Sequence, residues 1–99
     1  MYQRASQGGG GDVLNPTIVH HVTNSTSASY TIDATKKYLA VGSGKLSYAG
    51  GLTSVAYIDK GTRTMLQTSS YVTITLSGTT LSMRYTGTGN GEFEVIQLD

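Results

Sequence analysis

The feature that most constrains the fold of this chain is a succession of short β-rich runs separated by turn signals. No segment repeats apolar residues at every third or fourth position over two turns, as an amphipathic helix requires. The runs are rich in β-branched and aromatic residues, which favour strands. We predict strands in eight segments: VLNPTIVHHV, ASYTID, KYLAVGS, TSVAYID, TRTMLQT, YVTITLS, TLSMRY and GEFEVIQL.

Glycine-containing turns support this prediction. Gly61 in IDKGTR lies where a short hairpin loop needs a positive φ, and Gly78 in LSGTTL lies between two clean strands. Asn90-Gly91 in GTGNGE is the dipeptide that most strongly favours a hairpin. The regular spacing of strands and turns predicts an all-β fold, an antiparallel β-sandwich of the jelly-roll type with about eight short strands.

Alternation along single strands predicts which face is buried. YVTITLS places its aliphatic residues on one side and its threonines on the other. TLSMRY places Leu81, Met83 and Tyr85 on one side. Because threonine suits a half-exposed pleated surface, we expect threonine rows on a solvated outer face.

Two segments near the chain ends are apolar on both faces. In IVHHV, regular alternation puts Ile18 and Val22 on one face, opposite a further valine. In EFEVIQL, Ile96 and Leu98 lie on the face opposite the phenylalanine. A two-layer sandwich buries one face of each sheet, so such strands are covered on both sides or face another chain. We expect Ile18, Val22, Ile96 and Leu98 at a subunit interface; a local third layer, or loops folded over the sheet, is the alternative.

The chain divides into a polar, glycine-rich N-terminal tail, residues 1–12, and a β-sandwich domain, residues 13–99. Glycine runs normally link two folded parts, but glycine also lets one backbone approach another closely. We therefore interpret the tail as an arm that docks on a neighbouring subunit. Its docking segment would be the run of Gly8, Gly9, Gly10 and Gly11.

Composition restricts the partners. The chain has 99 residues and no cysteine, so it is one small domain without disulfides or thiolate metal sites, and such domains often oligomerise. Charged residues make up 13%, the net charge is +1, and serine and threonine supply more than a quarter of the chain. Such a surface does not hold a polyanion, so we exclude nucleic acid as the main partner. The sequence also lacks the apolar runs of a membrane span or a secretory signal.

Two histidines and two glutamates are the residues closest to a catalytic or metal site. Adjacent side chains on a strand point to opposite faces, so His20 and His21 cannot bind one ion within a single chain. Glu92 and Glu94 share a face, and paired carboxylates can perform acid–base chemistry, but a solvated strand face is their commoner role. The sequence has no nucleophile elbow, complete phosphate loop or calcium loop. We predict no enzymatic activity, no cofactor and no metal.

One tyrosine is a candidate ligand contact. Tyr48 in GKLSYAGG lies in a loop between predicted strands, with glycine on both sides. An exposed loop tyrosine offers a flat face to sugars or peptides at low entropic cost. The alternative is that this tyrosine covers the open end of the sandwich.

The segments SYTIDATKKYLAVGSG, TSVAYIDKGTRTMLQTSSYVTITLSGTTLSMRY and FEVIQL follow a polar, glycine-rich start. In overall pattern they resemble small β-sandwich tail-tip and fibre-tip proteins of phages and prophages. The resemblance covers Ser29 to Leu98. It implies a structural virion protein, usually a homotrimer, that contacts other virion proteins and cell-surface carbohydrate and has no enzymatic activity. It also implies assembly in the bacterial cytoplasm and release by lysis.

Other functions stay open at this point. A head decoration protein would use the tail to grip the capsid lattice. A carbohydrate-binding module or adhesin head would present a concave, tyrosine-bearing surface that includes Tyr48. A small hydrolase would need a pocket that joins the histidines to the two glutamates, and the sequence shows none.

Overall fold

The protein is all-β. Its structure, a computed structural model, describes residues 16–44 and 52–99, and these ranges contain strands and no helix. The described residues form eight strands: β1 (Thr17–Ser25), β2 (Ser27–Thr31), β3 (Lys37–Gly44), β4 (Thr53–Asp59), β5 (Thr62–Gln67), β6 (Val72–Ser77), β7 (Thr80–Tyr85) and β8 (Gly91–Gln97). The prediction of eight strands is confirmed, and their bounds lie close to the predicted segments except for β1, which continues three residues beyond VLNPTIVHHV to Ser25.

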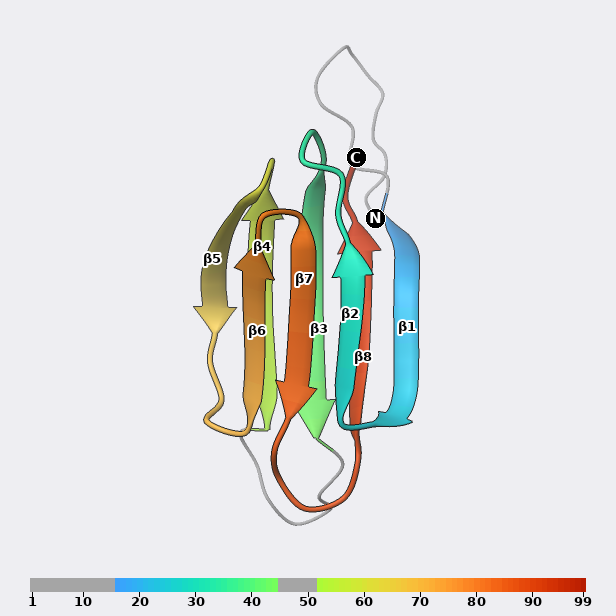
Figure 1. Ribbon diagram of the computed structural model, residues 1–99, viewed down its shortest axis with the longest axis vertical. Coiled ribbons are helices and arrows are strands. Elements are labelled where there is room, and N and C mark those ends of the chain that lie inside the picture. The colour runs from blue at the N-terminus through green and yellow to red at the C-terminus, as the bar shows by residue number, and fades with distance from the viewer. Residues whose placement is uncertain (1–15, 45–51) are drawn as a thin grey trace, which may run out of the picture.

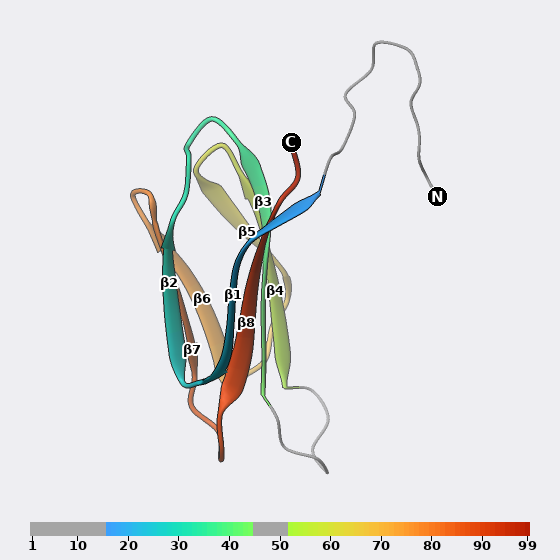
Figure 2. The ribbon, with the colours of Figure 1, turned by 90° about the vertical axis from the view of Figure 1, so that its right-hand side faces the viewer.

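The strands form two antiparallel sheets that pack face to face (Figures 1 and 2). The five-stranded sheet has the order β1-β8-β3-β4-β5, and the three-stranded sheet has the order β2-β7-β6. The chain passes from one sheet to the other four times, between β1 and β2, β2 and β3, β5 and β6, and β7 and β8. The pairing does not confirm the jelly-roll type, because β3 pairs with β4 and β8 and β6 pairs only with β7.

The core lies between the sheets and follows the predicted alternation. The aromatic residues Tyr38, Tyr85 and Phe93 are its largest fully buried side chains. Aliphatic residues from both sheets pack around them, among them Ile58 and Leu81. The inward faces predicted for β6 and β7 are confirmed, and the threonines between the inward residues are exposed.

Three glycine turns were predicted, and two are confirmed. Gly61 and Gly78 have positive φ values of 90° and 60° and join hairpin strands. The hairpin predicted at Asn90-Gly91 is wrong, because β7 and β8 lie in different sheets. Gly91 instead lies within β8, where a Cβ would stand 2.9 Å from the Cβ of Tyr85. Close packing against Tyr85, rather than a tight turn, therefore explains why residue 91 is a glycine.

Candidate interaction surface

A β-bulge in β1 changes which residues face outward. Ile18 pairs with Ile96, but the register shifts before His20, which pairs with Val95. One extra residue reverses the alternation beyond it. Val22 consequently pairs with Phe93 and packs against the core.

This register corrects one part of the sequence interpretation. Ile18 and Val22 do not share a face, because the bulge at Val19 separates them. Val22 packs against the core of its own chain, so it needs no partner subunit to cover it. Ile18 and Ile96 remain neighbours on the outer face, and Leu98 follows β8 with its backbone N–H donating to Lys37 O over 2.8 Å.

The outer face of the five-stranded sheet is apolar across its centre. The strand registers form one transverse row, Ile18–Ile96–Leu39–Tyr57–Thr64, and a second row, His21–Glu94–Val41–Val55–Gln67. Ile18 is 57% exposed, and the other apolar members are half-buried. We call this surface the apolar face and define it by six residues: Ile18, Leu39, Val41, Val55, Tyr57 and Ile96.

Four of these six residues were missed by the sequence interpretation, which placed two-faced strands only at the chain ends. The signal was present in KYLAVGS and TSVAYID. In both segments apolar residues occupy both faces: Tyr38 and Ala40 in the first, and Ala56 and Ile58 in the second, are the buried ones. The alternate residues Leu39, Val41 and Tyr57 therefore lie on the outer side of the sheet.

The outer face of the three-stranded sheet has the opposite character. Its nine outward positions are all exposed, and eight of them carry a hydroxyl group. The ninth is Arg84, in the middle strand β7. We call this surface the hydroxyl face; its residues are Ser27, Ser29, Thr31, Thr73, Thr75, Ser77, Thr80, Ser82 and Arg84. The two outer faces of one sandwich thus differ sharply in polarity.

One edge of the sandwich is capped by side chains. Strand β6 pairs with β7 alone, so its other edge has no strand partner. The carbonyl of Val72 accepts a hydrogen bond from Ser54 Oγ over 2.7 Å, and the carbonyl of Ile74 accepts one from the Arg63 guanidinium. Both donors come from the five-stranded sheet. These contacts tie the two sheets together and occupy carbonyls that another strand would otherwise use.

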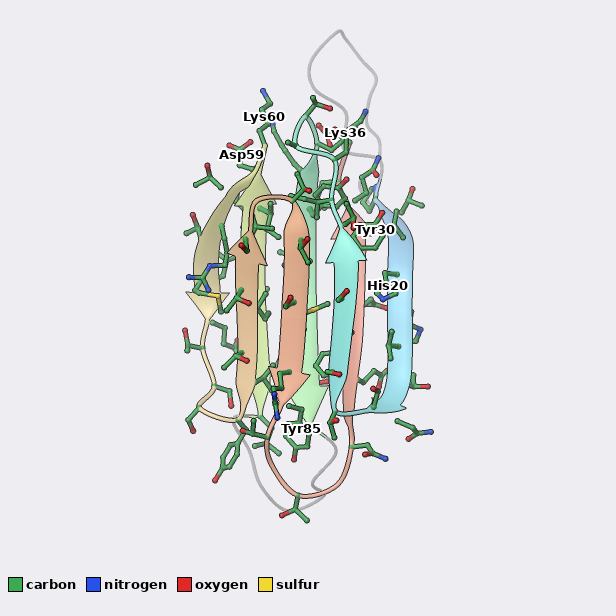
Figure 3. The ribbon with its side chains drawn as sticks, in the orientation of Figure 1. His20, Tyr30, Lys36, Asp59, Lys60 and Tyr85 are labelled. Carbon is green, nitrogen blue, oxygen red and sulfur yellow. The ribbon has the colours of Figure 1, made fainter. Side chains whose placement is uncertain are left out.

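The histidines point to opposite sides, as predicted from strand geometry. His20 lies between the sheets at the β1–β2 side, with its ring centroid 5.4 Å from that of Tyr30 (Figure 3). Partial burial and the nearby Tyr38 raise the pKa of the Tyr30 phenol. His21 lies on the outer face, where its Nε2 is 2.7 Å from Glu92 Oε2.

No three-ligand cluster accompanies these histidines. Within residues 16–44 and 52–99, no group of three or more histidine, aspartate or glutamate side chains is placed to hold a metal ion. Glu94 pairs in register with His21 on one side and Val41 on the other, so it stands beside the aliphatic centre of the apolar face. The glutamate pair and both histidines therefore do not converge on one pocket.

Several charged side chains lie at one end of the sandwich, and one of them forms local hydrogen bonds. Lys36, Asp59 and Lys60 lie at one end of the sandwich and Tyr85 at the other (Figure 3). Nearby, Asp33 Oδ1 accepts hydrogen bonds from the hydroxyl and the backbone N–H of Thr35. These bonds lower the pKa of the Asp33 carboxyl.

Two predicted sites lie outside the described residues. These are the glycine segment Gly8 to Gly11 and the loop tyrosine Tyr48. No helix in the described part of the chain is long and apolar enough to cross a membrane. Comparison with protein-family models, curated proteins and solved structures finds no match for this chain.

Proposed function

We propose that this protein is a structural subunit that works as a homo-oligomer, with the apolar face covered in the assembly. The proposal rests on the contrast between the two outer faces. A sandwich built to stand alone in water has no need for Leu39, Val41 and Tyr57 on an outer face when the opposite sheet carries only hydroxyls and an arginine.

The free energy available from covering this face supports association. Burying a whole aliphatic or aromatic side chain stabilises by about 1.5 to 3 kcal/mol. Ile18 is 57% exposed, so covering it contributes roughly 1 to 2 kcal/mol. The half-buried members add smaller amounts each. Together, and counted on both partners, these terms oppose the free energy that association costs in lost freedom of motion.

The resemblance of residues 29–98 to phage tail-tip and fibre-tip proteins supports a place for this assembly in a virion. In that role the subunit is a scaffold, and the proposal assigns it no catalytic step. The resemblance favours other virion proteins as neighbours and contact with host-surface glycans. It also favours a threefold assembly, whereas a single apolar face favours a twofold one, and the mass of the assembly distinguishes the two. The jelly-roll description belongs to the same proposal, since the pairs β1–β8, β2–β7 and β4–β5 are those of a rolled eight-stranded ribbon.

The first test concerns self-association. We expect the purified full chain to sediment as an oligomer at micromolar concentration. The matched deletion of Met1 to Gly11 tests the arm: the sandwich should stay folded by circular dichroism while the assembly weakens. A wild-type chain that stays monomeric would contradict the homo-oligomer, and unchanged assembly after the deletion would remove the arm from the proposal.

The second test concerns the virion. Mass spectrometry of purified particles from a host that carries this gene should detect the chain, in tail fractions rather than in separated heads. Its recovery in heads alone would favour a head decoration protein. Its absence from particles would contradict a virion role and leave self-association untouched.

A further inference from the structure

The apolar face spans all the central strands of the five-stranded sheet, and its chemistry indicates what covers it. We propose that a second copy of this chain covers it, packed through the same face about a twofold axis. This inference rests on the proposed function, because it names the partner and the symmetry of the same surface.

The symmetry follows from how many apolar surfaces the chain presents. A contact between different patches requires two complementary surfaces on every copy, whereas a twofold contact requires one self-complementary patch. Among the described residues, the apolar face is the continuous apolar surface, and the hydroxyl face is polar throughout. The other exposed large apolar side chains, Leu66 and Tyr71, stand near the β5–β6 connection. They do not extend across a sheet, so the described residues present one continuous apolar patch, which favours a twofold axis.

The shape and size of the apolar face fit a like partner. Sheets pack face to face with strand directions within about 30° of each other. Five strands about 4.8 Å apart, each about seven residues long, cover roughly 24 Å by 24 Å, or about 600 Å² before side-chain relief is counted. Two such faces come to about 1,200 Å² in total, which is the lower end of the range for specific, stable interfaces. A dimer through this surface would therefore use most of the outer side of the sheet.

The N-terminal tail is a less suitable occupant. Residues 1–15 join the described fold at Pro16, close to Ile18, and when fully extended would reach about 50 Å, enough to cross the sheet. Their composition does not match the surface, because glycine and polar residues dominate and only a few apolar side chains are available. Such a segment buries less apolar surface against the face than a second copy of the face would bury.

Removing the charge of Glu94 should change the strength of the dimer in the opposite direction to adding a charge on the apolar face. Its in-register neighbours are His21 on β1 and Val41 on β3, and Glu92 follows on its own strand. The remaining charged residues on this outer face, Lys37 and Asp59, are register partners at one end of the β3–β4 pair. Covering the face removes water from the Glu94 carboxylate, which costs free energy. Glu94→Gln should therefore tighten the dimer, whereas a charge placed among the aliphatic residues should weaken it.

The experiment measures the mass of the full chain and of matched variants by sedimentation across concentration. Val55→Lys places a charge on the apolar face, and Thr75→Lys places the same charge on an outward position of the hydroxyl face. We expect a wild-type dimer, a dissociation constant at least about tenfold weaker for Val55→Lys, no change for Thr75→Lys, and at least about threefold tighter binding for Glu94→Gln. Circular dichroism confirms that each variant is folded.

Disulfide trapping tests the symmetry without a destabilising charge. The chain has no cysteine, so one introduced cysteine forms a covalent dimer only where two copies bring the same residue together. Leu39→Cys and Val41→Cys lie on the central strand β3, near the expected axis, and Ser82→Cys on the central strand β7 is the control. At least one of the two β3 variants should oxidise to a dimer several-fold more completely than the control.

The outcomes separate this inference from the proposed function. A trimer, or equal loss of assembly in Val55→Lys and Thr75→Lys, overturns the twofold face-to-face contact and leaves a homo-oligomeric structural protein. Failure of both β3 cysteines to form a dimer, or weaker binding in Glu94→Gln, also overturns the contact. A monomer that dimerises only after residues 1–11 are deleted makes the tail the occupant and overturns the inference. A monomer in every form overturns both.

Discussion

Replacing Ser54 by alanine removes the hydroxyl that joins the two sheets at the β6 edge. Ser54 is fully buried, its Oγ donates to Val72 O over 2.7 Å, and it accepts from the Ser69 backbone N–H over 2.8 Å. Ser69 is only 6% exposed and Val72 only 1%. The substitution therefore leaves a buried carbonyl and a buried N–H that water reaches poorly.

The size of the effect follows from these two orphaned groups. Leaving one buried donor or acceptor without a partner costs about 1 to 3 kcal/mol. With two such groups and some local relaxation, we expect Ser54→Ala to lower the free energy of unfolding by about 2 to 4 kcal/mol. For a domain of this size that corresponds to a Tm lower by about 10 °C or more.

Urea unfolding at one fixed protein concentration, followed by tyrosine fluorescence and circular dichroism, measures this difference. The fixed concentration matters because self-association adds to apparent stability. Ser82→Ala, on the exposed hydroxyl face, is the matched control and should change the free energy by less than about 0.5 kcal/mol. If Ser54→Ala is as mild as this control, the reasoning about the buried hydroxyl is refuted.

Three further predictions follow from single contacts. Gly44→Ala would push a Cβ into the Tyr85 ring and should destabilise by about 1 to 3 kcal/mol in the same urea assay; a neutral effect would contradict this packing. Arg63→Ala removes the hydrogen-bond donor from the Ile74 carbonyl and should speed aggregation on heating, measured by light scattering. Aggregation no faster than that of the wild type would contradict this role. Hydrogen bonds from Thr35 lower the pKa of the Asp33 carboxyl, so its stabilising effect is present above the ordinary aspartate pKa and is lost as pH falls through the lowered one. Asp33→Asn should therefore make Tm less dependent on pH below about pH 4; parallel curves for the two proteins would contradict this.

Local sequence signals predicted the strands well. The bounds of β4 and β7 coincide with the segments TSVAYID and TLSMRY, because apolar alternation and flanking turns define both ends. Gly61 and Gly78 were identifiable for the same reason, since hairpins with tight loops demand positive φ locally.

Features that depend on tertiary structure were not predictable in this way. The bulge at Val19 leaves no mark in IVHHV, yet it moves Val22 into the core. Asn90-Gly91 carries a strong hairpin signal, but the chain changes sheets there and Gly91 serves close packing against Tyr85. Local propensity does not specify which sheet a strand joins.

The candidate surface was predicted in part. Ile18 and Ile96 were identified as outward apolar residues, and they are in-register neighbours on the apolar face. Leu39 and Tyr57 were not identified as outward residues, because their segments have the pattern of ordinary buried strands. Only the strand order shows that they lie in the same row as Ile96. The extent of the face therefore depends on strand order, which alternation within one segment does not contain.

Sedimentation of the full chain across concentration is the most direct test of the central claim that the apolar face is a contact between copies. We expect a particle of twice the 10.4 kDa subunit mass that reverts towards 10.4 kDa in Val55→Lys and not in Thr75→Lys. A wild-type chain that remains at 10.4 kDa up to about 100 µM would contradict it.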